Sequence, residues 1–372
     1  MNNKYKKLAE EIFELAGVQV NGSNPWDIQI HNEDFYKRAI TEGPLGVGES
    51  YMDAWWDVEN VDEFISKIIR AQLDEKIQRM GSVLFQLITL RLFNLQSKQR
   101  AFIVGEKHYD LGNDLFQNML DPRMNYSCAY WKNATNLNEA QDDKLELICH
   151  KLFLEPGMRV LDIGCGWGAF GKYAAEKYKV EVVGITVSKE QVELGRKMCE
   201  GLPVEFRLID YRDLNEKFDR IVSVGMFEHV GDKNYKTFFE VANKCLVDHS
   251  LFLLQTIGRI KSLKALDPWM HKYIFPNAML PSVVQIDRAI KNLFVMEDWH
   301  NFGPDYDKTL MAWHDNFVHN WDKIKGQYSE RFFRMWKYYL LSSAGSFRAR
   351  SNQLWQVVLS RNGVPGGYQS VR

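Results

Sequence analysis

A run of glycines follows a short apolar stretch near the middle of the chain. The run reads Val160-Leu161-Asp162-Ile163-Gly164-Cys165-Gly166-Trp167-Gly168. The residues before the first glycine have the largely apolar, partly β-branched character of a buried strand. Glycine lets the backbone turn sharply and approach a ligand closely. The segment therefore predicts a strand followed by a turn that cradles a small molecule.

The spacing of the glycines permits more than one interpretation. Gly166, Gly168 and Gly171 satisfy the G-x-G-x-x-G pattern of dinucleotide sites, which place an acidic residue about 20 residues further on. Gly184-Ile185-Thr186 stands there instead. The D-x-G-x-G core that begins at Asp162 resembles the nucleoside-binding turn of class I methyltransferases. The pattern thus favours S-adenosylmethionine over a dinucleotide, and a turn that serves only the fold is the third interpretation.

Longer motifs lie on both sides of this turn. They read His108-Tyr109-Asp110-Leu111-Gly112-Asn113, Tyr126-Ser127-Cys128-Ala129-Tyr130-Trp131, Gly225-Met226-Phe227-Glu228-His229-Val230 and Tyr273-Ile274-Phe275-Pro276. Together with the glycine turn they resemble the bacterial cyclopropane fatty acid synthases over essentially the whole chain. Mycolic acid cyclopropane synthases, which act on carrier-bound chains, share these motifs, but the amino-terminal module favours the branch that acts on phospholipids. The resemblance implies transfer of a methylene equivalent from S-adenosylmethionine to the cis double bond of an unsaturated phospholipid acyl chain.

The resemblance also implies which residues contact S-adenosylmethionine. They come from a Tyr-Ser pair before a cysteine, from the glycine turn, and from the ends of the next two strands. The set is Tyr126, Ser127, Asp162, Gly164, Gly166, Trp167, Gly168, Thr186, Gln191, Asp210 and Tyr211.

This chemistry makes demands that the composition can meet. An alkene that attacks the sulfonium methyl group becomes a carbocation, which aromatic faces stabilise. A base must then remove a proton from the new methyl group, and water must be excluded because it would quench the cation. Aromatic residues make up 13% of the chain, with 11 Trp and 22 Phe, which suits an aromatic pocket. An aromatic-rich core is the alternative interpretation.

In the family the base is a bound bicarbonate ion, held by four side chains and a backbone amide. Carried over residue by residue, these groups are Cys128, Glu228, Gln255, Tyr306 and the amide of Ile257. Gln255 stands where the family has a histidine. A glutamine amide can donate a hydrogen bond to an oxyanion but cannot change its charge near neutral pH. We therefore expect bicarbonate binding to persist with altered affinity or pH dependence.

Each of these side chains also has a purely structural interpretation. Glu228 beside an anion requires burial and a raised pKa, so that the neutral acid donates a hydrogen bond; otherwise it is a solvated glutamate. Cys128 can be a small buried hydrophobe, and a lone tyrosine such as Tyr306 usually packs. A second family cysteine falls at Ser343, so no covalent role for a thiol is expected there. No histidine or cysteine spacing indicates a metal site, and no metal is expected.

The residues from about 145 onward alternate short apolar strands with segments of helix length. The predicted strands cover 158–163, 180–185, 204–209, 218–224 and 251–256. This rhythm predicts an α/β fold of the class I S-adenosylmethionine-dependent methyltransferase (Rossmann-like) type, a parallel sheet that binds ligands at the carboxyl ends of its strands. A strand near 355–359 would close the sheet, and an aromatic-rich insertion at 260–305 would roof the active site.

The amino-terminal part has a different character. Residues 1–95 are predicted to form a small, mainly helical domain associated with the membrane or a dimer, and residues 96–372 the catalytic domain. The aromatic residues of Ser50 to Trp56 could anchor at lipid headgroups or fill a core. The segment from Val83 to Leu95 precedes several cations, which suggests a lipid-docking helix or a buried one. Family precedent suggests a homodimer with peripheral membrane contact.

Composition narrows the remaining possibilities. The formal net charge of -1 argues against nucleic acid as a partner. Five widely spaced cysteines without a C-x-x-C pair indicate a reducing cytoplasm, and the charged amino terminus does not predict a signal peptide. We expect a cytoplasmic enzyme at the inner face of the membrane. The alternatives are a fatty acid methylase, a small-molecule N- or O-methyltransferase, and a lipid-binding protein without activity.

Overall fold

The computed structural model describes residues 2–73, 112–262 and 266–372. The chain divides into two compact units. The first comprises Met1–Met119, Ala265–Asn277 and Leu310–Ser351, and the second comprises Leu120–Lys264, Ala278–Thr309 and Asn352–Arg372. The predicted boundary after residue 95 and the predicted docking segment 83–95 lie outside the described residues. Within the described ranges, no helix has the length and apolar character needed to cross a bilayer.

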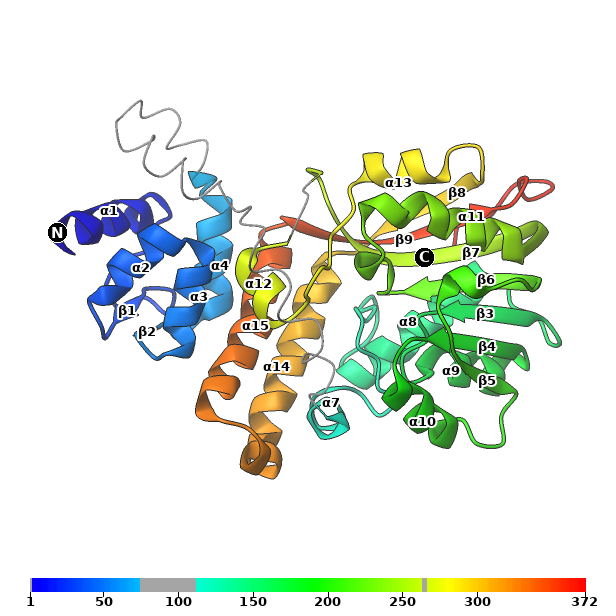
Figure 1. Cartoon of the computed structure of the whole chain (residues 1–372), viewed down its shortest axis with the longest axis horizontal. Coiled ribbons are helices and arrows are strands. Elements are labelled where there is room, and N and C mark those ends of the chain that lie inside the picture. Colours follow the sequence, from blue (N-terminus) through cyan, green and yellow to red (C-terminus); the bar gives the residue numbers. More distant parts are fainter. Residues whose placement is uncertain (1, 74–111, 263–265) are drawn as a thin grey trace. The chain divides into compact units, whose positions relative to one another are not determined.

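The first unit is mainly helical (Figure 1). Its helices are α1 (Asn2–Leu15), α2 (Asp34–Glu42), α3 (Pro44–Met52), α4 (Val61–Arg70), α7 (Asn113–Met119), α12 (Pro268–Tyr273), most of α14 (Pro304–Ile324) and α15 (Glu330–Arg348), with a 3-10 turn at Lys325–Gln327. Two short strands, β1 (Gln29–Ile30) and β2 (Trp56–Asp57), pair antiparallel. Side chains cap the later helices, as where Ser329 accepts a hydrogen bond from the Phe332 amide at the start of α15.

An aromatic cluster fills the centre of the first unit. Trp56 is fully buried, with its ring centroid 5.0 Å from that of Tyr51 and 5.4 Å from that of Phe64. The Trp56 indole N–H donates to the carbonyl of Val47 at 3.0 Å. Of the two interpretations of the Ser50 to Trp56 segment, the structure supports the core for Tyr51 and Trp56.

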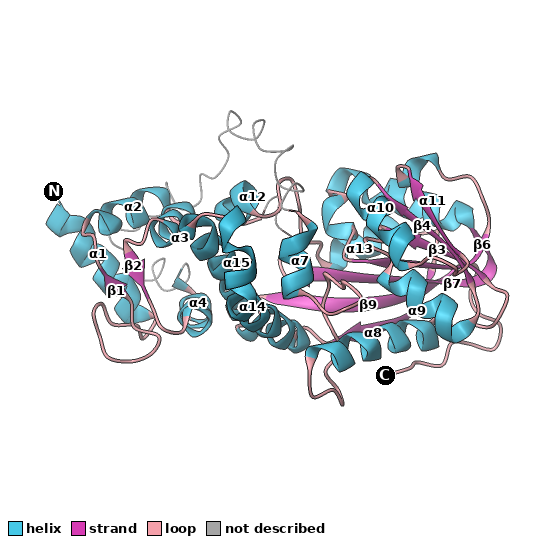
Figure 2. Cartoon of the chain, turned by 90° about the horizontal axis from the view of Figure 1, so that it is seen from below, coloured by secondary structure: helices cyan, strands magenta, loops and turns pink. Residues whose placement is uncertain are grey.

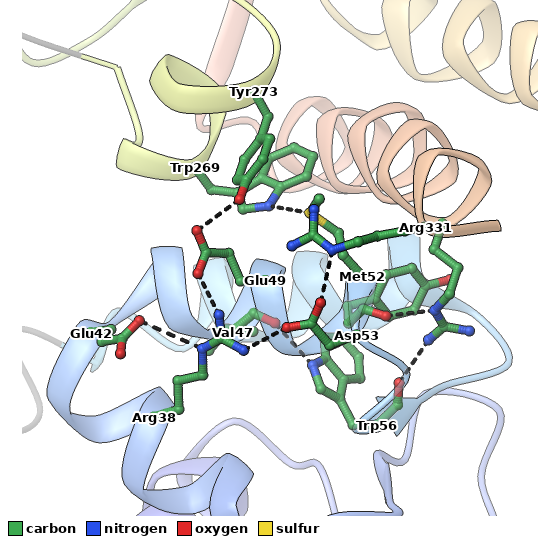
Figure 3. Close-up of polar contacts among 12 residues, drawn as sticks. Arg38, Glu42, Val47, Glu49, Met52, Asp53, Trp56, Trp269, Tyr273 and Arg331 are labelled. Carbon is green, nitrogen blue, oxygen red and sulfur yellow. Dashed lines mark hydrogen bonds and ion pairs between the residues drawn. The ribbon is translucent and has the colours of Figure 1, made fainter. Parts of the chain in front are cut away.

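A polar network joins α3 to α12 within the same unit (Figure 3). The carboxylate of Glu49 accepts hydrogen bonds from Arg38, from Lys272 and, at 2.8 Å, from the hydroxyl of Tyr273. Arg38 also donates to Asp53 at 2.8 Å. Burial opposes ionisation of Glu49, but these hydrogen bonds hold its pKa below the usual value. Two stretches of chain more than 200 residues apart are therefore joined by paired charges.

The second unit is built on a seven-stranded sheet. Its strands are β3 (Arg159–Ile163), β4 (Glu181–Thr186), β5 (Val204–Leu208), β6 (Phe218–Val224), β7 (Leu246–Arg259), β8 (Val295–Asn301) and β9 (Asn352–Ser360), in the order β5-β4-β3-β6-β7-β9-β8. The five strands β3 to β7 run parallel to one another, and β9 pairs antiparallel with both β7 and β8. The predicted α/β fold, its five parallel strands and the strand near 355–359 are confirmed.

The predicted insertion at 260–305 is not a single element. Residues Val295–Asn301 form the edge strand β8, and Trp299 packs its ring against Trp355 of β9 at 4.9 Å. The segment that carries Trp269 and Tyr273 belongs to the first unit, where it contains α12. Strand pairing and packing thus use some of the aromatic side chains of this segment, whereas Phe302 lies in a cluster with Cys128.

Helices cover both faces of this sheet (Figures 1 and 2). α11 (Tyr235–Cys245) and α13 (Val283–Ile290) pack on the face that holds Leu161 and Ile163, whereas α8 (Leu137–Lys151) and α9 (Ala169–Tyr178) pack on the face that holds Val160. Side chains alternate along a strand, so Asp162 belongs to the face covered by α8. α10 (Lys189–Met198) and the 3-10 turns Tyr211–Asp213, Phe227–His229 and Asp232–Asn234 complete the unit.

The contact between α4 and α15 should tolerate no added side-chain volume. A methyl group at Gly345 would overlap the backbone oxygen of Asp62 and lie 3.0 Å from the Cβ of Ile65. Gly345→Ala is therefore expected to lower the free energy of unfolding by about 1–3 kcal/mol, measured by urea denaturation of the full chain. Gly326→Ala is the control, because a methyl group there meets nothing within 4 Å. Equal stability of the two variants would contradict this account of the contact.

Candidate active site

Predicted site residues gather at the carboxyl ends of the parallel strands. Gly164 follows β3, Thr186 ends β4, Asp210 comes shortly after β5, and Glu228 comes shortly after β6. Neighbouring parallel strands end at the same edge of a sheet, where open α/β sheets bind ligands. The fold therefore brings together residues that lie up to about 60 positions apart in the sequence.

The glycine turn has the geometry of a ligand cradle. Gly164, Gly166 and Gly168 have φ angles of +83°, +55° and +88°, which favour glycine. The amide of Gly164 donates to the carbonyl of Ile185 on β4 at 2.9 Å. A methyl group on Gly164 would lie 2.6 Å from the side chain of Met226, whereas one on Gly166 would meet nothing within 4 Å. Contact with Met226 explains why position 164 requires glycine. The open space beside Gly166 leaves room for a ligand.

Two other members of the turn are buried. Trp167 is buried within the turn, and Asp162 lies beneath it on the α8 face of β3. Burial raises the pKa of Asp162 to about 7, although the charge of Lys144 on α8 opposes this shift.

The ends of β4 and β5 each form a small side-chain pair. The hydroxyl of Thr186 donates to the amide oxygen of Gln191 at 2.7 Å, which joins β4 to the first turn of α10. The carboxylate of Asp210 accepts from the backbone amide of Arg212 at 2.9 Å and from its guanidinium at 2.8 Å. These bonds to Arg212 lower the pKa of Asp210. Tyr211 is buried against Phe238 at a ring distance of 5.4 Å.

Ser127, which follows Tyr126, reaches the same edge. A methyl group on Gly225 would lie 3.9 Å from the Cβ of Ser127, so Ser127 lies beside the end of β6. Gln141 of α8 donates to the carbonyl of Ser127 at 2.9 Å, and Lys144 of α8 donates to its hydroxyl oxygen at 3.0 Å. The sequence analysis missed Gln141 and Lys144, although both are polar residues within a helix that packs on the sheet.

Cys128 begins a second group of residues. Its side chain is fully buried in a cluster against which Ile257 and Tyr306 also pack. Burial raises the pKa of the Cys128 thiol well above its usual value, so the sulfur stays protonated at neutral pH. A protonated thiol is a poor nucleophile. The buried members of the cluster are Cys128, Tyr130, Leu147, Phe302 and Leu354.

Glu228 has one carboxyl oxygen bonded and one buried alone. Its Oε1 accepts from the amide of Ile257 at 2.6 Å, and its Oε2 is buried with no hydrogen-bond partner among the described residues. Burial raises the pKa of Glu228 to about 7. The neutral acid can then donate a hydrogen bond from Oε2. The amide of Ile257, predicted to face an anion, is taken by Glu228 in this structure.

Gln255 is oriented by a neighbour that the sequence analysis missed. Gln356 lies opposite Gln255 in the β7–β9 pair, and its amide group donates to the Gln255 oxygen at 2.9 Å. The amino group of Gln255 therefore points the other way, 3.4 Å from the carbonyl of Cys128. The only sequence signal for Gln356 is one polar residue among the apolar residues 354–359.

Thr309 holds the segment after Cys128 in place. Its hydroxyl oxygen accepts from the Ala129 amide at 3.1 Å and the Trp131 indole at 3.0 Å, and it donates to the carbonyl of Asp305 at 2.7 Å. The same oxygen lies 4.0 Å from the Cys128 sulfur. Direct bonds and shared packing thus connect all five members of the predicted anion site. Across the described ranges, no cluster of three His, Cys, Asp or Glu residues could hold a metal ion.

Comparison with known proteins agrees with this geometry. Residues 96–357 match the family described as mycolic acid cyclopropane synthetase. The chain is 56% identical over 371 residues to the cyclopropane-fatty-acyl-phospholipid synthase of Escherichia coli (strain K12), covering 100% of this chain and 97% of that one. It is 38% identical over 265 residues to a probable fatty acid methyltransferase of Pseudomonas putida, covering 68% of this chain and 67% of that one.

Solved structures show the same likeness. A cyclopropane synthase from Mycobacterium tuberculosis superposes with a TM-score of 0.64 at 34% identity, covering 68% of this chain and 96% of that chain. A mycolic acid cyclopropane synthase complexed with S-adenosylhomocysteine (SAH) and CTAB gives a TM-score of 0.63 at 34% identity and the same coverage. Coclaurine N-methyltransferase, at 23% identity and a TM-score of 0.65, shares the fold.

The buried carboxyl of Glu228 predicts a pH-dependent stability. Between its ordinary pKa of 4.5 and its folded value of about 7, the folded state keeps a proton that the unfolded chain has released. Stability therefore falls as the pH rises across this range, by about 3 kcal/mol for this group alone. Glu228→Gln removes that loss, so its advantage over the wild type should grow from pH 4.5 to 7, measured by urea denaturation at several pH values.

Glu200→Gln is the matched control because Glu200 is exposed. It should follow the wild-type pH profile. A constant stability difference between Glu228→Gln and the wild type at all pH values would show that Glu228 ionises normally in the folded protein.

Proposed function

The chain belongs to the family described as mycolic acid cyclopropane synthetase, and from this membership we propose that it is a cyclopropane-fatty-acyl-phospholipid synthase. Enzymes of this kind depend on S-adenosylmethionine. The chain transfers a methylene equivalent from that donor to the cis double bond of unsaturated phospholipid acyl chains. The observation that carries the proposal is 56% identity over the whole length to the Escherichia coli phospholipid enzyme, including residues 1–95, which the family match does not cover.

Residues at the carboxyl edge of the sheet would bind the methyl donor. S-adenosylmethionine supplies an electrophilic methyl group on a sulfonium sulfur. The open space beside Gly166 admits the donor, and the pair Thr186–Gln191 together with Ser127 offers hydrogen-bonding groups around it. Held in this way, the methyl group would face the alkene at short range, which removes much of the entropic cost of the reaction.

The second group of residues suits the steps after methyl transfer. Attack by the alkene leaves a carbocation on the acyl chain and neutral SAH. Tyr130 and Phe302, with ring centroids 5.3 Å apart, lie in the cluster of Cys128 and could stabilise the cation by their π faces. Their burial also excludes water.

A bound bicarbonate ion would supply the base that takes the proton before the ring closes. The residues present fit an oxyanion. The amino group of Gln255 is aimed at Cys128, and the unpartnered Oε2 of Glu228 becomes a donor when protonated. The phenol of Tyr306 packs against the same cluster. The ion would be held by Cys128, Glu228, Gln255 and Tyr306. The Ile257 amide would act indirectly, because it donates its hydrogen bond to Glu228.

We also propose peripheral contact with the inner face of the membrane and a homodimeric state, both of which follow from the phospholipid substrate and the family. A fatty acid methylase is the second candidate function. It is favoured by Gln255 in place of histidine and by the likeness to the Pseudomonas putida protein. Such an enzyme would form the same cation but lose a different proton.

The products distinguish these functions. The pure protein is incubated with unsaturated phospholipid vesicles and methyl-labelled S-adenosylmethionine, and fatty acid methyl esters are separated and analysed by mass spectrometry. A saturated ring product, one CH2 heavier than the substrate chain, is expected. A methylated chain without a ring would identify a methylase, and the absence of any lipid product would reject both functions.

The Gln255 position should control the response to bicarbonate. Gln255→His introduces a group that is charged below its usual pKa of about 6.5 and binds an anion more strongly in that form. We expect the bicarbonate concentration for half-maximal activity to fall by about 3- to 10-fold at pH 6 and to return toward the wild-type value at pH 8. Gln327→His, at an exposed position of the first unit, should leave this concentration unchanged. No change in Gln255→His would remove the residue from the anion site.

A further inference from the structure

Two lysines of α8 are buried, and neither is used by the chemistry described above. Lys144 is 1% exposed and Lys151 is fully buried. A buried ammonium group is costly unless it is paired, so each must have partners that justify its position. The partners of the two lysines differ in kind.

Lys144 is bonded to the segment that carries the first site residues. Its Nζ donates to the side-chain oxygen of Asn125 at 2.6 Å and to the hydroxyl oxygen of Ser127 at 3.0 Å. An ammonium group can only donate, so the Ser127 oxygen is the acceptor in this bond. The proton of the Ser127 hydroxyl is thereby left for a different acceptor. Ser127 lies beside Gly225, at the edge where the parallel strands end.

Charge around Lys144 points to an anionic ligand group. Burial lowers the pKa of Lys144 to about 8, and attraction to the carboxylates of Asp121 and Asp162 opposes that shift. Asp162 lies under the glycine turn, where burial raises its own pKa to about 7. Near neutral pH the ammonium group of Lys144 therefore places a positive charge behind Ser127, and the carboxyl group of Asp162 balances part of that charge. Such a charge favours a carboxylate in front of Ser127 over an uncharged group.

We propose that Lys144 is a positioning residue for the amino-acid end of the methyl donor: it holds Ser127 so that the serine hydroxyl donates to the donor's carboxylate. This inference rests on the proposed function, because that function supplies the ligand. It adds a specific role for a helix residue behind the site. Gln141, three residues earlier on α8, fixes the Ser127 backbone, while Lys144 fixes its hydroxyl.

Two ligands that differ in the proposed group provide the test. SAH carries the amino-acid carboxylate, and 5′-methylthioadenosine lacks the amino-acid end but keeps the nucleoside. Their dissociation constants are measured by calorimetry at pH 7 with the full-length protein. Lys144→Met should weaken SAH binding by about 10- to 100-fold and weaken 5′-methylthioadenosine binding by less than about 3-fold.

Lys151→Met is the matched control, since it removes a second buried lysine from the same helix. Lys151 lies 3.0 Å from the Nδ1 of His300 and 3.7 Å from Asp298, so it should affect folding but neither dissociation constant. Ser127→Ala should weaken SAH selectively, and adding Lys144→Met to it should cause little further loss, because both changes break one interaction. Lys144→Gln replaces the methionine variant if the latter does not fold.

The outcomes distinguish a failure of the role proposed for Lys144 from a failure of the proposed function. Equal weakening of both ligands by Lys144→Met, or the same weakening by Lys151→Met, would assign Lys144 a merely structural role and overturn the inference. Independent effects of the Ser127 and Lys144 changes would also overturn it. A wild-type protein that binds neither ligand would instead overturn the proposed function itself.

Discussion

The backbone of residues 125–131 is largely buried but belongs to no strand or helix. Buried amide and carbonyl groups must be hydrogen-bonded, and here side chains supply most of the partners, although the Tyr130 amide donates to the carbonyl of Ala140 at 2.9 Å. Gln141 bonds the Ser127 carbonyl, Thr309 accepts from the Ala129 amide, and Asp305 accepts from the Trp131 amide at 2.8 Å. The positions of α8 and the first two turns of α14 therefore fix the segment on which both groups of site residues depend.

Ser127 and Cys128 are adjacent in this segment yet serve different parts of the proposed reaction. Ser127 lies beside the end of β6 with the methyl donor site, while Cys128 lies in the apolar cluster with Ile257 and Tyr306. In the proposed reaction, one peptide unit would set the spacing between the methyl donor and the group that removes the proton. A rigid spacing of this kind would let the cation be resolved soon after it forms, before water can reach it.

The sequence predicts well the features whose causes are local. Short apolar runs predict the five parallel strands. Three closely spaced glycines predict the turn, and all three have positive φ angles in the structure. The edge strand β8 escaped prediction because Val295–Asn301 contains acidic and amide residues and lacks a clean alternation. Gln356 escaped because its partner lies 101 residues away, and only the fold shows that the two strands are neighbours. The raised pKa of Glu228 was anticipated, but its bond to the Ile257 amide was not.

The place of β9 in the sheet has a consequence for how the protein is made. β9 lies between β7 and β8, yet the chain reaches it only after the helices of Leu310–Ser351, which belong to the other unit. On the ribosome, β8 emerges long before its partner β9. Until β9 is made, one side of β7 also has no neighbouring strand. An unpaired strand is exposed to aggregation and to proteases until its neighbour arrives. A nascent chain arrested before residue 352 would thus lack Gln356, leave β8 unpaired and leave one side of β7 open, so biosynthesis of this enzyme should depend on protection of the growing sheet.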